Sequence, residues 1–224
     1  MKKRSVGILG ASVDPAHQGH IEVLKQALAK LSLDEVWLMV TPQSTAKTAY
    51  QLAPVAHRLH LAHTATRKSG LLGSKLKVSE FEVVLHQLGV SSATAVVLEH
   101  FSNAYPQLQP VWLMGSDNLA GLHTWGDRWT EIMEKYPVGV FGRSGANEAA
   151  LSSEAARRFA HTRVAARDFK AVPGTWCFLE SETHPASSTS IREALKSGTR
   201  PLHLSSDSYL YIKKYGLYDR SIVQ

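Results

Sequence analysis

The stretch from residue 5 to residue 31 constrains the fold of this chain more than any other part of it. Residues 5–9 read as a short apolar strand, and Gly10 with the small residues after it allows a tight turn. An Asp-Pro dipeptide at 14–15 is typical of a turn, because proline fixes its own φ and disfavours helix in the residue before it. Apolar residues then recur at helical spacing through 21–31. The stretch therefore predicts a strand, a small-residue loop and a helix.

Two histidines stand where this helix is expected to begin. His17 and His20 are three residues apart, so both can face one object if they are helical or nearly so. A helix N-terminus presents unpaired N–H groups and favours an anion such as phosphate, and Gly19 leaves room for phosphate oxygens to approach. A helix start with two solvated histidines is the alternative. The strand, the turn and the glycine together favour a phosphate site.

Length and composition indicate an ordinary globular protein. The chain has 224 residues, of which 44% are hydrophobic and 20% charged, and we expect a single domain over 1–224. No apolar run approaches the roughly 20 residues needed to span a bilayer, and residues 1–4 lead into a strand rather than a signal-peptide core. The single cysteine, Cys177, excludes an internal disulfide and suits the reducing cytoplasm.

A formal charge of +6 favours anionic partners. Nucleic acid is one such partner, but no basic run with interleaved aromatic residues supports it. A phosphorylated small substrate explains the charge equally well. His57, His60 and His63 do not suggest a metal site, because steps of three residues spread them over about 120° of a helix surface.

Residues 10–20 resemble the opening signature of the HxGH nucleotidyltransferases, usually seen as GGxFDPxHxGH. The nearest family is the bacterial nicotinate mononucleotide adenylyltransferases. Ser12 and Val13 depart from the usual pattern, and neither departure removes a catalytic group. The resemblance implies catalytic roles for His17 and His20. It also implies ATP contacts in the same segment, made by Gly10, Ala11, Ser12 and Gly19.

Further along the chain, apolar runs alternate with helical patterns. Strands are expected at 35–40, 76–78, 111–114, 137–142 and 175–179, and helices at 54–68, from about 91–94 to 105, and over the Ala- and Arg-rich stretch 146–171. This alternation predicts a doubly wound α/β domain, with parallel strands, helices on both faces and ligands over the carboxyl ends of the strands.

Residues 185–192 form a second chemical anchor. Ser188 or Thr189 is a good N-cap for the helix that follows, and Arg192 can grip two oxygens. Hydroxyls, free N–H groups and a guanidinium together suit a polyphosphate. The segment resembles the family's ISSTxIR motif, which implies that Ser188 and Thr189 bind ATP and that Arg192 is catalytic.

A third segment follows the strand at 111–114. Gly115 and Asp117 lie at the carboxyl end of a buried strand, where open α/β sheets bind ligands. The block resembles the family's GxDxLxxLxxWxxW region. That resemblance implies that Gly115 and Asp117 contact nucleotide and that Trp125 stacks on a pyridine ring, while Trp129 is expected in the core.

The pyridine-binding region departs most from the family. Where the family usually reads SYTxDTL, this chain has Ser92, Ala93 and Ala95 at the tyrosine, threonine and aspartate positions. The resemblance carries Ser92 and Ala93 over as substrate-binding positions. It also implies substrate-binding roles for Lys47, the lysine of an altered PPHK segment, and for Arg58, which in the family helps to hold this loop.

The resemblance, which extends to the tail at 208–218, implies adenylyl transfer from ATP to nicotinate mononucleotide. Mg²⁺ would arrive with ATP, so no dedicated protein metal site is expected. The alternatives are an HxGH transferase with another acceptor, a class I aminoacyl-tRNA synthetase fragment, or a nucleotide-binding paralogue without turnover. We expect a cytoplasmic protein with no nucleic-acid or membrane partner. The sequence leaves the oligomeric state open, a homo-oligomer included.

Overall fold

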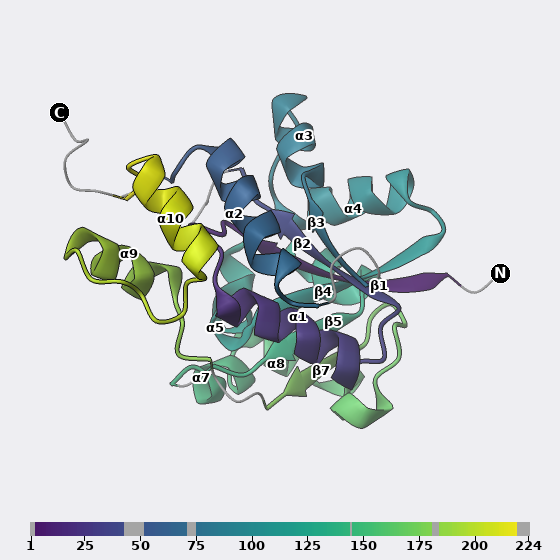
Figure 1. Ribbon diagram of the computed structural model, residues 1–224. Coiled ribbons are helices and arrows are strands. Elements are labelled where there is room, and N and C mark those ends of the chain that lie inside the picture. Colours follow the sequence, from purple (N-terminus) through teal and green to yellow (C-terminus); the bar gives the residue numbers. More distant parts are fainter. Residues whose placement is uncertain (1–2, 43–51, 71–74, 144, 181–183, 219–224) are drawn as a thin grey trace.

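The computed structural model describes residues 3–42, 52–70, 75–143, 145–180 and 184–218. Within them, the strands form one sheet in the order β3-β2-β1-β4-β5-β7-β6, and every neighbouring pair is parallel (Figure 1). The strands are β1 (Arg4–Ala11), β2 (Glu35–Val40), β3 (Leu76–Ser79), β4 (Leu108–Gly115), β5 (Val138–Phe141), β6 (Arg163–Val164) and β7 (Trp176–Leu179). The predicted doubly wound parallel α/β fold is confirmed.

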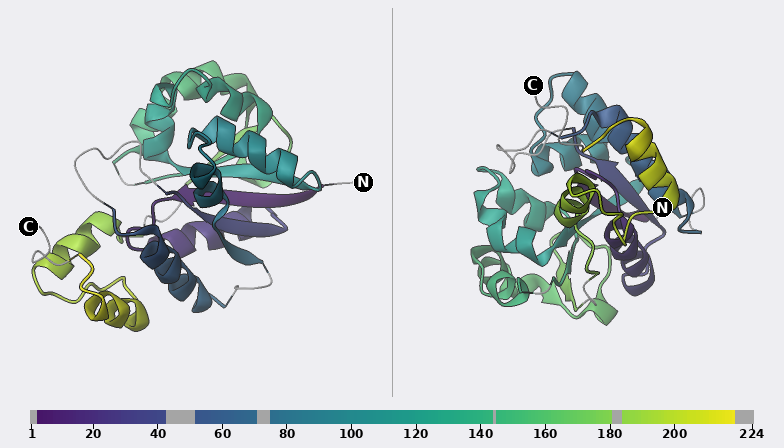
Figure 2. Two further views of the ribbon diagram at one scale, coloured as in Figure 1. Left: turned by 90° about the horizontal axis from the view of Figure 1, so that it is seen from above. Right: turned by 60° about the vertical axis from the view of Figure 1, so that its left-hand side comes forward.

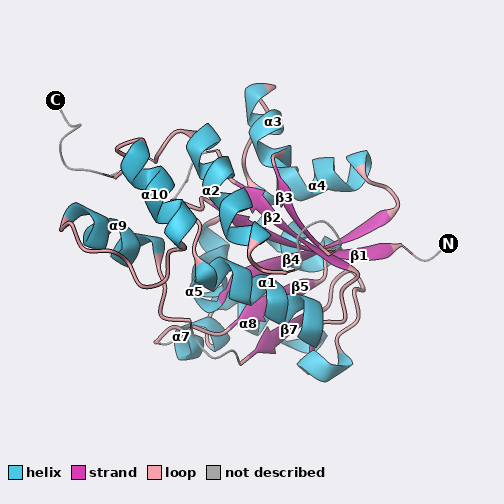
Figure 3. Cartoon of the chain, in the orientation of Figure 1, coloured by secondary structure: helices cyan, strands magenta, loops and turns pink. Residues whose placement is uncertain are grey.

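Helices cover both faces of this sheet (Figure 3). They are α1 (Gln18–Lys30), α2 (Val55–Arg67), α3 (Phe81–Gln87), α4 (Thr94–Ala104), α5 (Ser116–Gly121), α6 (Trp129–Lys135), α7 (Asn147–Leu151), α8 (Glu154–Arg158), α9 (Ser188–Lys196) and α10 (Ser206–Lys214), with 3₁₀ turns η1 (Leu122–Thr124), η2 (Ala160–Thr162) and η3 (Ala166–Asp168). None of the described helices is long and apolar enough to cross a membrane.

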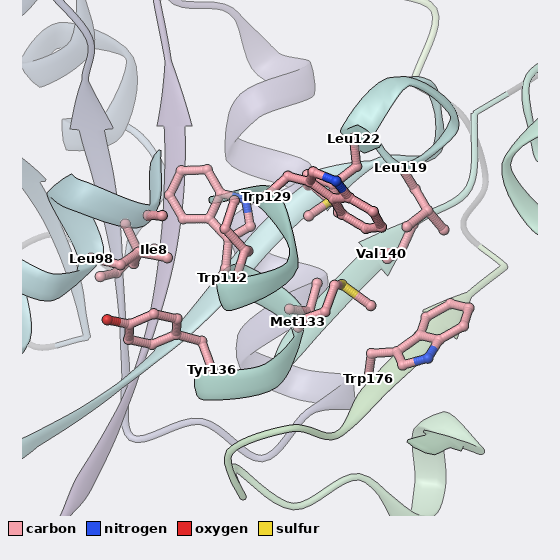
Figure 4. Close-up of a cluster of buried hydrophobic side chains, with 14 of the residues drawn as sticks. Ile8, Leu98, Trp112, Leu119, Leu122, Trp129, Met133, Tyr136, Val140 and Trp176 are labelled. Carbon is pink, nitrogen blue, oxygen red and sulfur yellow. The ribbon is translucent and has the colours of Figure 1, made fainter. Parts of the chain in front are cut away.

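Successive residues of the central strands point to opposite faces, as the twofold period of a strand requires. Ile8 and Trp112 belong to one buried cluster, which α4 and α6 complete; Figure 4 shows it around Trp129. Leu9 and Leu113 belong to a second cluster, against α1 and α2. Burial on both faces explains why these strands read as continuous apolar runs. Trp129, 8% exposed, is a core residue as predicted.

The stretch 146–171 differs from the single helix that its spacing predicts. It forms α7 and α8, then η2, the two-residue edge strand β6 and η3. Helix α7 ends at Leu151 with Ser152 as its C-cap, and Ser153 starts α8, because its hydroxyl accepts a hydrogen bond from the Ala156 N–H at the N-cap. Ala150 and Ala155 are fully buried, so these helices are part of the core rather than surface additions. The short helix α3 and strand β6 were also not predicted.

The last two helices form a layer of their own beside α2. Figure 2 shows α9 and α10 together at one side of the molecule. A third hydrophobic cluster joins them to α2 through Leu61, Ile191, Leu195, Leu204 and Ile212. This layer carries the second sequence motif to the carboxyl edge of the sheet.

The strand order reverses direction between β1 and β4. After β1 the chain enters α1, whose Leu24 packs on one face of the sheet, and after β4 it enters α5, whose Leu119 packs on the other. In open α/β sheets the crevice above such a switch point binds ligands. The two segments that end at Ala11 and Gly115 therefore flank the expected site.

Candidate active site

The loop between β1 and α1 is held from beneath by Arg58. Its Nε and two NH groups donate to the carbonyl oxygens of Ala53 (2.8 Å), Ser12 (2.8 Å), Thr41 (2.6 Å) and Pro42 (2.7 Å). The side chain is 1% exposed, and burial lowers its pKa although Asp14 opposes this. Arg58 thus fixes two loops to each other. The guanidinium is committed to backbone carbonyls, which is the loop-holding arrangement that the resemblance implied for Arg58, and its contact with substrate stays a prediction.

The histidines at the start of α1 cap their own helix. His17 is the N-cap residue, and its Nδ1 accepts a hydrogen bond from the Gly19 N–H at 3.1 Å. The His17 N–H in turn donates to Nδ1 of His20 at 3.3 Å, which completes a capping box. Because both Nδ1 atoms accept, the hydrogen-bond network assigns the ring proton of each neutral imidazole to Nε2. With Nδ1 accepting from the backbone, each ring can donate a hydrogen bond from Nε2, on the opposite side of the ring.

The charge state of His17 follows from its surroundings. The side chain is buried, and burial, followed by the nearby His20, lowers its pKa from 6.5 to about 2. His184 and Arg143 lower it further. The ring is therefore neutral at physiological pH and offers Nε2–H as a hydrogen-bond donor rather than a positive charge.

Two glycines in this segment are required by packing. A Cβ on Gly19 would lie 2.9 Å from Cε1 of His17 and 3.3 Å from the Ala186 carbonyl oxygen. Gly19 therefore makes room for the His17 ring and for the backbone of the second motif. A Cβ on Gly10 would lie 2.5 Å from Cη2 of Trp112. Core packing against Trp112 therefore requires glycine at position 10.

The second motif lies directly against this loop. Ser187 is the N-cap of α9, since its Oγ accepts from the Ser190 N–H at 3.0 Å, so the expected cap at Ser188 or Thr189 was wrong by one or two residues. Ser188 Oγ instead donates to the Pro15 carbonyl oxygen at 3.1 Å, and Thr189 Oγ1 accepts from Arg192 at 3.2 Å. The N-termini of α1 and α9 are therefore fastened together.

Arg192 and Asp14 form the centre of that junction. NH1 of Arg192 donates to the Asp14 carbonyl oxygen at 2.6 Å, and the arginine is 7% exposed. The Asp14 carboxylate is fully buried and accepts from Ala53 N–H and from the hydroxyl of Tyr218. In the sequence, Asp14 is recognisable only as part of a turn. No local pattern could reveal partners so far along the chain.

The carboxyl end of β4 contributes an ion pair. Asp117 accepts from NH1 of Arg143 at 3.2 Å, and both side chains are about half exposed. A Cβ on Gly115 would collide with both side chains, which is why this position suits glycine. Arg143 was not predicted as a site residue, yet it acts electrostatically on His17. Its signal was a cation at the carboxyl end of a buried strand, the same signal that identified Asp117.

The expected pyridine-binding residues lie on the face of the sheet that α4 covers. Trp125 follows η1 and is half-buried against the cluster that contains Ala95. Ala93 is the N-cap of α4 but makes no side-chain cap, and its N–H donates to Ser91 Oγ at 3.2 Å. Ser92, beside it, is half-buried. Lys47 lies outside the described residues.

Comparison with known proteins identifies the family. Residues 8–194 match the cytidylyltransferase-like family model, a span that contains both histidines and Arg192. A probable nicotinate-nucleotide adenylyltransferase of Cereibacter sphaeroides is 41% identical over 188 residues, which cover 84% of this chain and 96% of the relative. The chain belongs to this adenylyltransferase family. A relative of the same name from Rhizobium meliloti is 37% identical and is covered completely.

Solved structures agree on the fold of this nucleotidyltransferase. Plasmodium falciparum nicotinic acid mononucleotide adenylyltransferase complexed with NaAD aligns with a TM-score of 0.72 at 18% identity, over 96% of this chain and 97% of that one. The same protein complexed with APC gives a TM-score of 0.69. The resemblance drawn from the two motifs is confirmed at the level of family and fold.

Proposed function

We propose that this adenylyltransferase joins ATP and nicotinate mononucleotide, giving nicotinate adenine dinucleotide and pyrophosphate. The observation that carries the proposal is the junction of two helix N-termini, α1 and α9, above the strand switch point. His17 offers an Nε2–H donor there, and Ser188 ties the two segments through the Pro15 carbonyl oxygen. Relatives that cover most of the chain bear the name of this reaction. We also treat the chain as one domain, because α9 and α10 pack on α2.

The chemistry makes few demands on the protein. A phosphate oxygen of the mononucleotide attacks the α-phosphorus of ATP, the bond from that phosphorus to the bridging oxygen breaks, and pyrophosphate leaves with the electron pair. The attacking phosphate is already ionised at neutral pH, so no general base is required. Catalysis then comes from positioning and from stabilising charge on the transferring and leaving groups.

Each motif residue has a role in this scheme. Neutral His17 donates Nε2–H to phosphate oxygens, and His20 donates from its own Nε2. Arg192, Ser188 and Thr189 lie beside the β- and γ-phosphates, where the free N–H groups of the first turn of α9 add donors. Gly10, Ala11, Ser12, Gly19 and Gly115 line the approach of the nucleotide, and Asp117 contacts a ribose or the mononucleotide.

We propose that Mg²⁺ arrives bound to ATP. Among the described residues, no group of three or more His, Cys, Asp or Glu side chains could hold a metal ion. The carboxylate of Asp117 is paired with Arg143, and that of Asp14 is buried against Tyr218 and Ala53. The magnesium ion would screen the polyphosphate, and the protein would contact the complex through its donors.

The pyridine ring is assigned to the region of Trp125, whose indole offers a flat apolar face. Ser92 and Ala93 line the start of α4, where free N–H groups favour a carboxylate over a neutral amide by about 0.3–1 kcal/mol. No side chain of the altered loop supplies an anionic acceptor for a carboxamide. We therefore assign the acid mononucleotide as the preferred substrate, with less discrimination than a loop that retains the usual side chains.

The test is pyrophosphate release from Mg-ATP with a panel of acceptors. Nicotinate mononucleotide should give the highest kcat/KM, ahead of its amide counterpart, with phosphopantetheine and cytidylyl acceptors inactive. Preference for phosphopantetheine would refute the acceptor. Absence of turnover with every acceptor, together with intact ATP binding, would favour a nucleotide-binding paralogue instead.

A further inference from the structure

The tail that follows α10 returns to the active-site loop. Helix α10 packs on α2, where His57 Nδ1 and the Tyr211 hydroxyl are 2.8 Å apart and the ring of Tyr211 stacks on His60 at 3.9 Å. The chain then turns through Gly216 and reaches Tyr218, which has a left-handed φ of +67°. Its hydroxyl donates to Oδ1 of Asp14 at 2.7 Å, across 204 residues of sequence.

Asp14 depends on this contact because it is a carboxylate without exposure to water. Its Oδ1 accepts from Tyr218 and, less closely, from the Ala53 N–H at 3.2 Å. Its Oδ2 has no hydrogen-bond partner among the described residues and lies 4.0 Å from NH1 of Arg192. Leaving a buried charged group short of donors is costly, so the Tyr218 hydroxyl has a large influence on where this carboxylate rests.

The position of Asp14 sets the position of both phosphate-binding motifs. Its carbonyl oxygen accepts a hydrogen bond from NH1 of Arg192, and the carbonyl oxygen of the next residue, Pro15, accepts one from the hydroxyl of Ser188. Only two residues separate Asp14 from His17, the N-cap of α1. A displacement of Asp14 would therefore change the distance between His17 and Arg192, and both must meet one polyphosphate.

We propose that Tyr218 is a positioning residue for adenylyl transfer, acting through Asp14 to keep His17 and Arg192 in register. The inference rests on the function proposed above. Tyr218 is not required to touch a substrate. It lowers the activation barrier by keeping the groups that bind the polyphosphate in alignment. A misplacement of these groups by about 1 Å is enough to slow such a reaction.

The test compares two tyrosine hydroxyls in the same C-terminal layer. Tyr218→Phe removes the hydroxyl that donates to Asp14, and Tyr211→Phe removes the hydroxyl that contacts His57 on α2. We expect Tyr218→Phe to lower kcat about tenfold at saturating substrates, with both KM values within about twofold of the parent. Both variants should lower the melting temperature by similar amounts, because each loses one hydroxyl hydrogen bond. Tyr211→Phe should leave kcat unchanged.

A double-mutant cycle tests the route through Asp14. Asp14→Ala combined with Tyr218→Phe should be no slower than Asp14→Ala alone, because alanine leaves the hydroxyl no side-chain acceptor at position 14. Equal loss of kcat in both phenylalanine variants, or normal kcat in Tyr218→Phe, would overturn the proposal. The comparison of the two phenylalanine variants decides the matter even if Asp14→Ala fails to fold. A parent enzyme inactive with nicotinate mononucleotide would instead refute the proposed function.

Discussion

His17 has two separable duties, and one pair of substitutions divides them. Its Nδ1 caps α1 through the Gly19 N–H, and its Nε2–H is the proposed donor to phosphate. Asparagine at position 17 retains an acceptor for the cap but has no donor at the Nε2 position, whereas alanine retains neither. Loss of the cap should cost about 0.5–2 kcal/mol of folding stability. Loss of the transition-state donor should cost about 3 kcal/mol of barrier, or roughly a hundredfold in rate.

His17→Asn should therefore remain nearly as stable as the parent while losing about a hundredfold or more in kcat. His17→Ala should lose the same activity and, in addition, the cap energy. Urea unfolding measures stability, steady-state pyrophosphate release measures turnover, and ATP affinity is titrated separately. His20→Ala serves as a second donor deletion with the same expected kinetic effect. A His17→Asn enzyme that keeps most of its turnover would refute the donor role, whatever its stability.

Three further predictions follow from the same geometry. The pKa of His17 is about 2 in the folded protein and 6.5 in the unfolded chain, so between these values only the unfolded chain takes up this proton. The free energy of unfolding should therefore fall as the pH is lowered. Between about pH 7.5 and 5.5 the parent should lose about 1.4 kcal/mol more of it than His17→Asn. Equal losses would place the folded pKa near 6.5. Arg192→Lys should raise the KM for ATP and leave that for the mononucleotide nearly unchanged, since an ammonium lacks the planar fork; equal increases would instead assign Arg192 to holding the Asp14 loop. The ratio of kcat/KM for the acid over the amide mononucleotide should exceed one under identical ATP and magnesium, and a ratio below one would contradict the carboxylate site.

The sheet could be predicted from the sequence because parallel strands are buried on both faces. The apolar run at 35–40 coincides with β2, and those at 111–114 and 137–142 lie within a residue or a few of β4 and β5. The stretch 146–171 was predicted wrongly, since alanine spacing suits one long helix or two short ones equally. Only the hydroxyl of Ser153, placed at an N-cap, distinguishes them.

In the site, too, features set by contiguous residues could be predicted, whereas contacts between distant segments could not. The histidine pair, Gly19 and the small-residue loop form a contiguous signal, so their arrangement at a helix start could be predicted. The commitment of Arg58 to four backbone carbonyls could not, because those oxygens come from two separate loops. The pairing of Arg143 with Asp117 could not be predicted either, because it joins two strand ends, although the place of Arg143 after a buried strand was visible in the sequence.

The contact between Asp14 and Tyr218 also has a consequence for biosynthesis. The β1 loop is among the first segments to leave the ribosome, and the tyrosine that holds its buried carboxylate is made 204 residues later. At about 5–20 residues per second, the two are separated by roughly ten seconds or more of translation. Until then a nascent chain can pair β1 with β2, whose contacts are close in sequence, but it has no complete nucleotide site. Newly made enzyme would therefore reach its full rate of turnover only after α10 has been synthesised and has docked on α2.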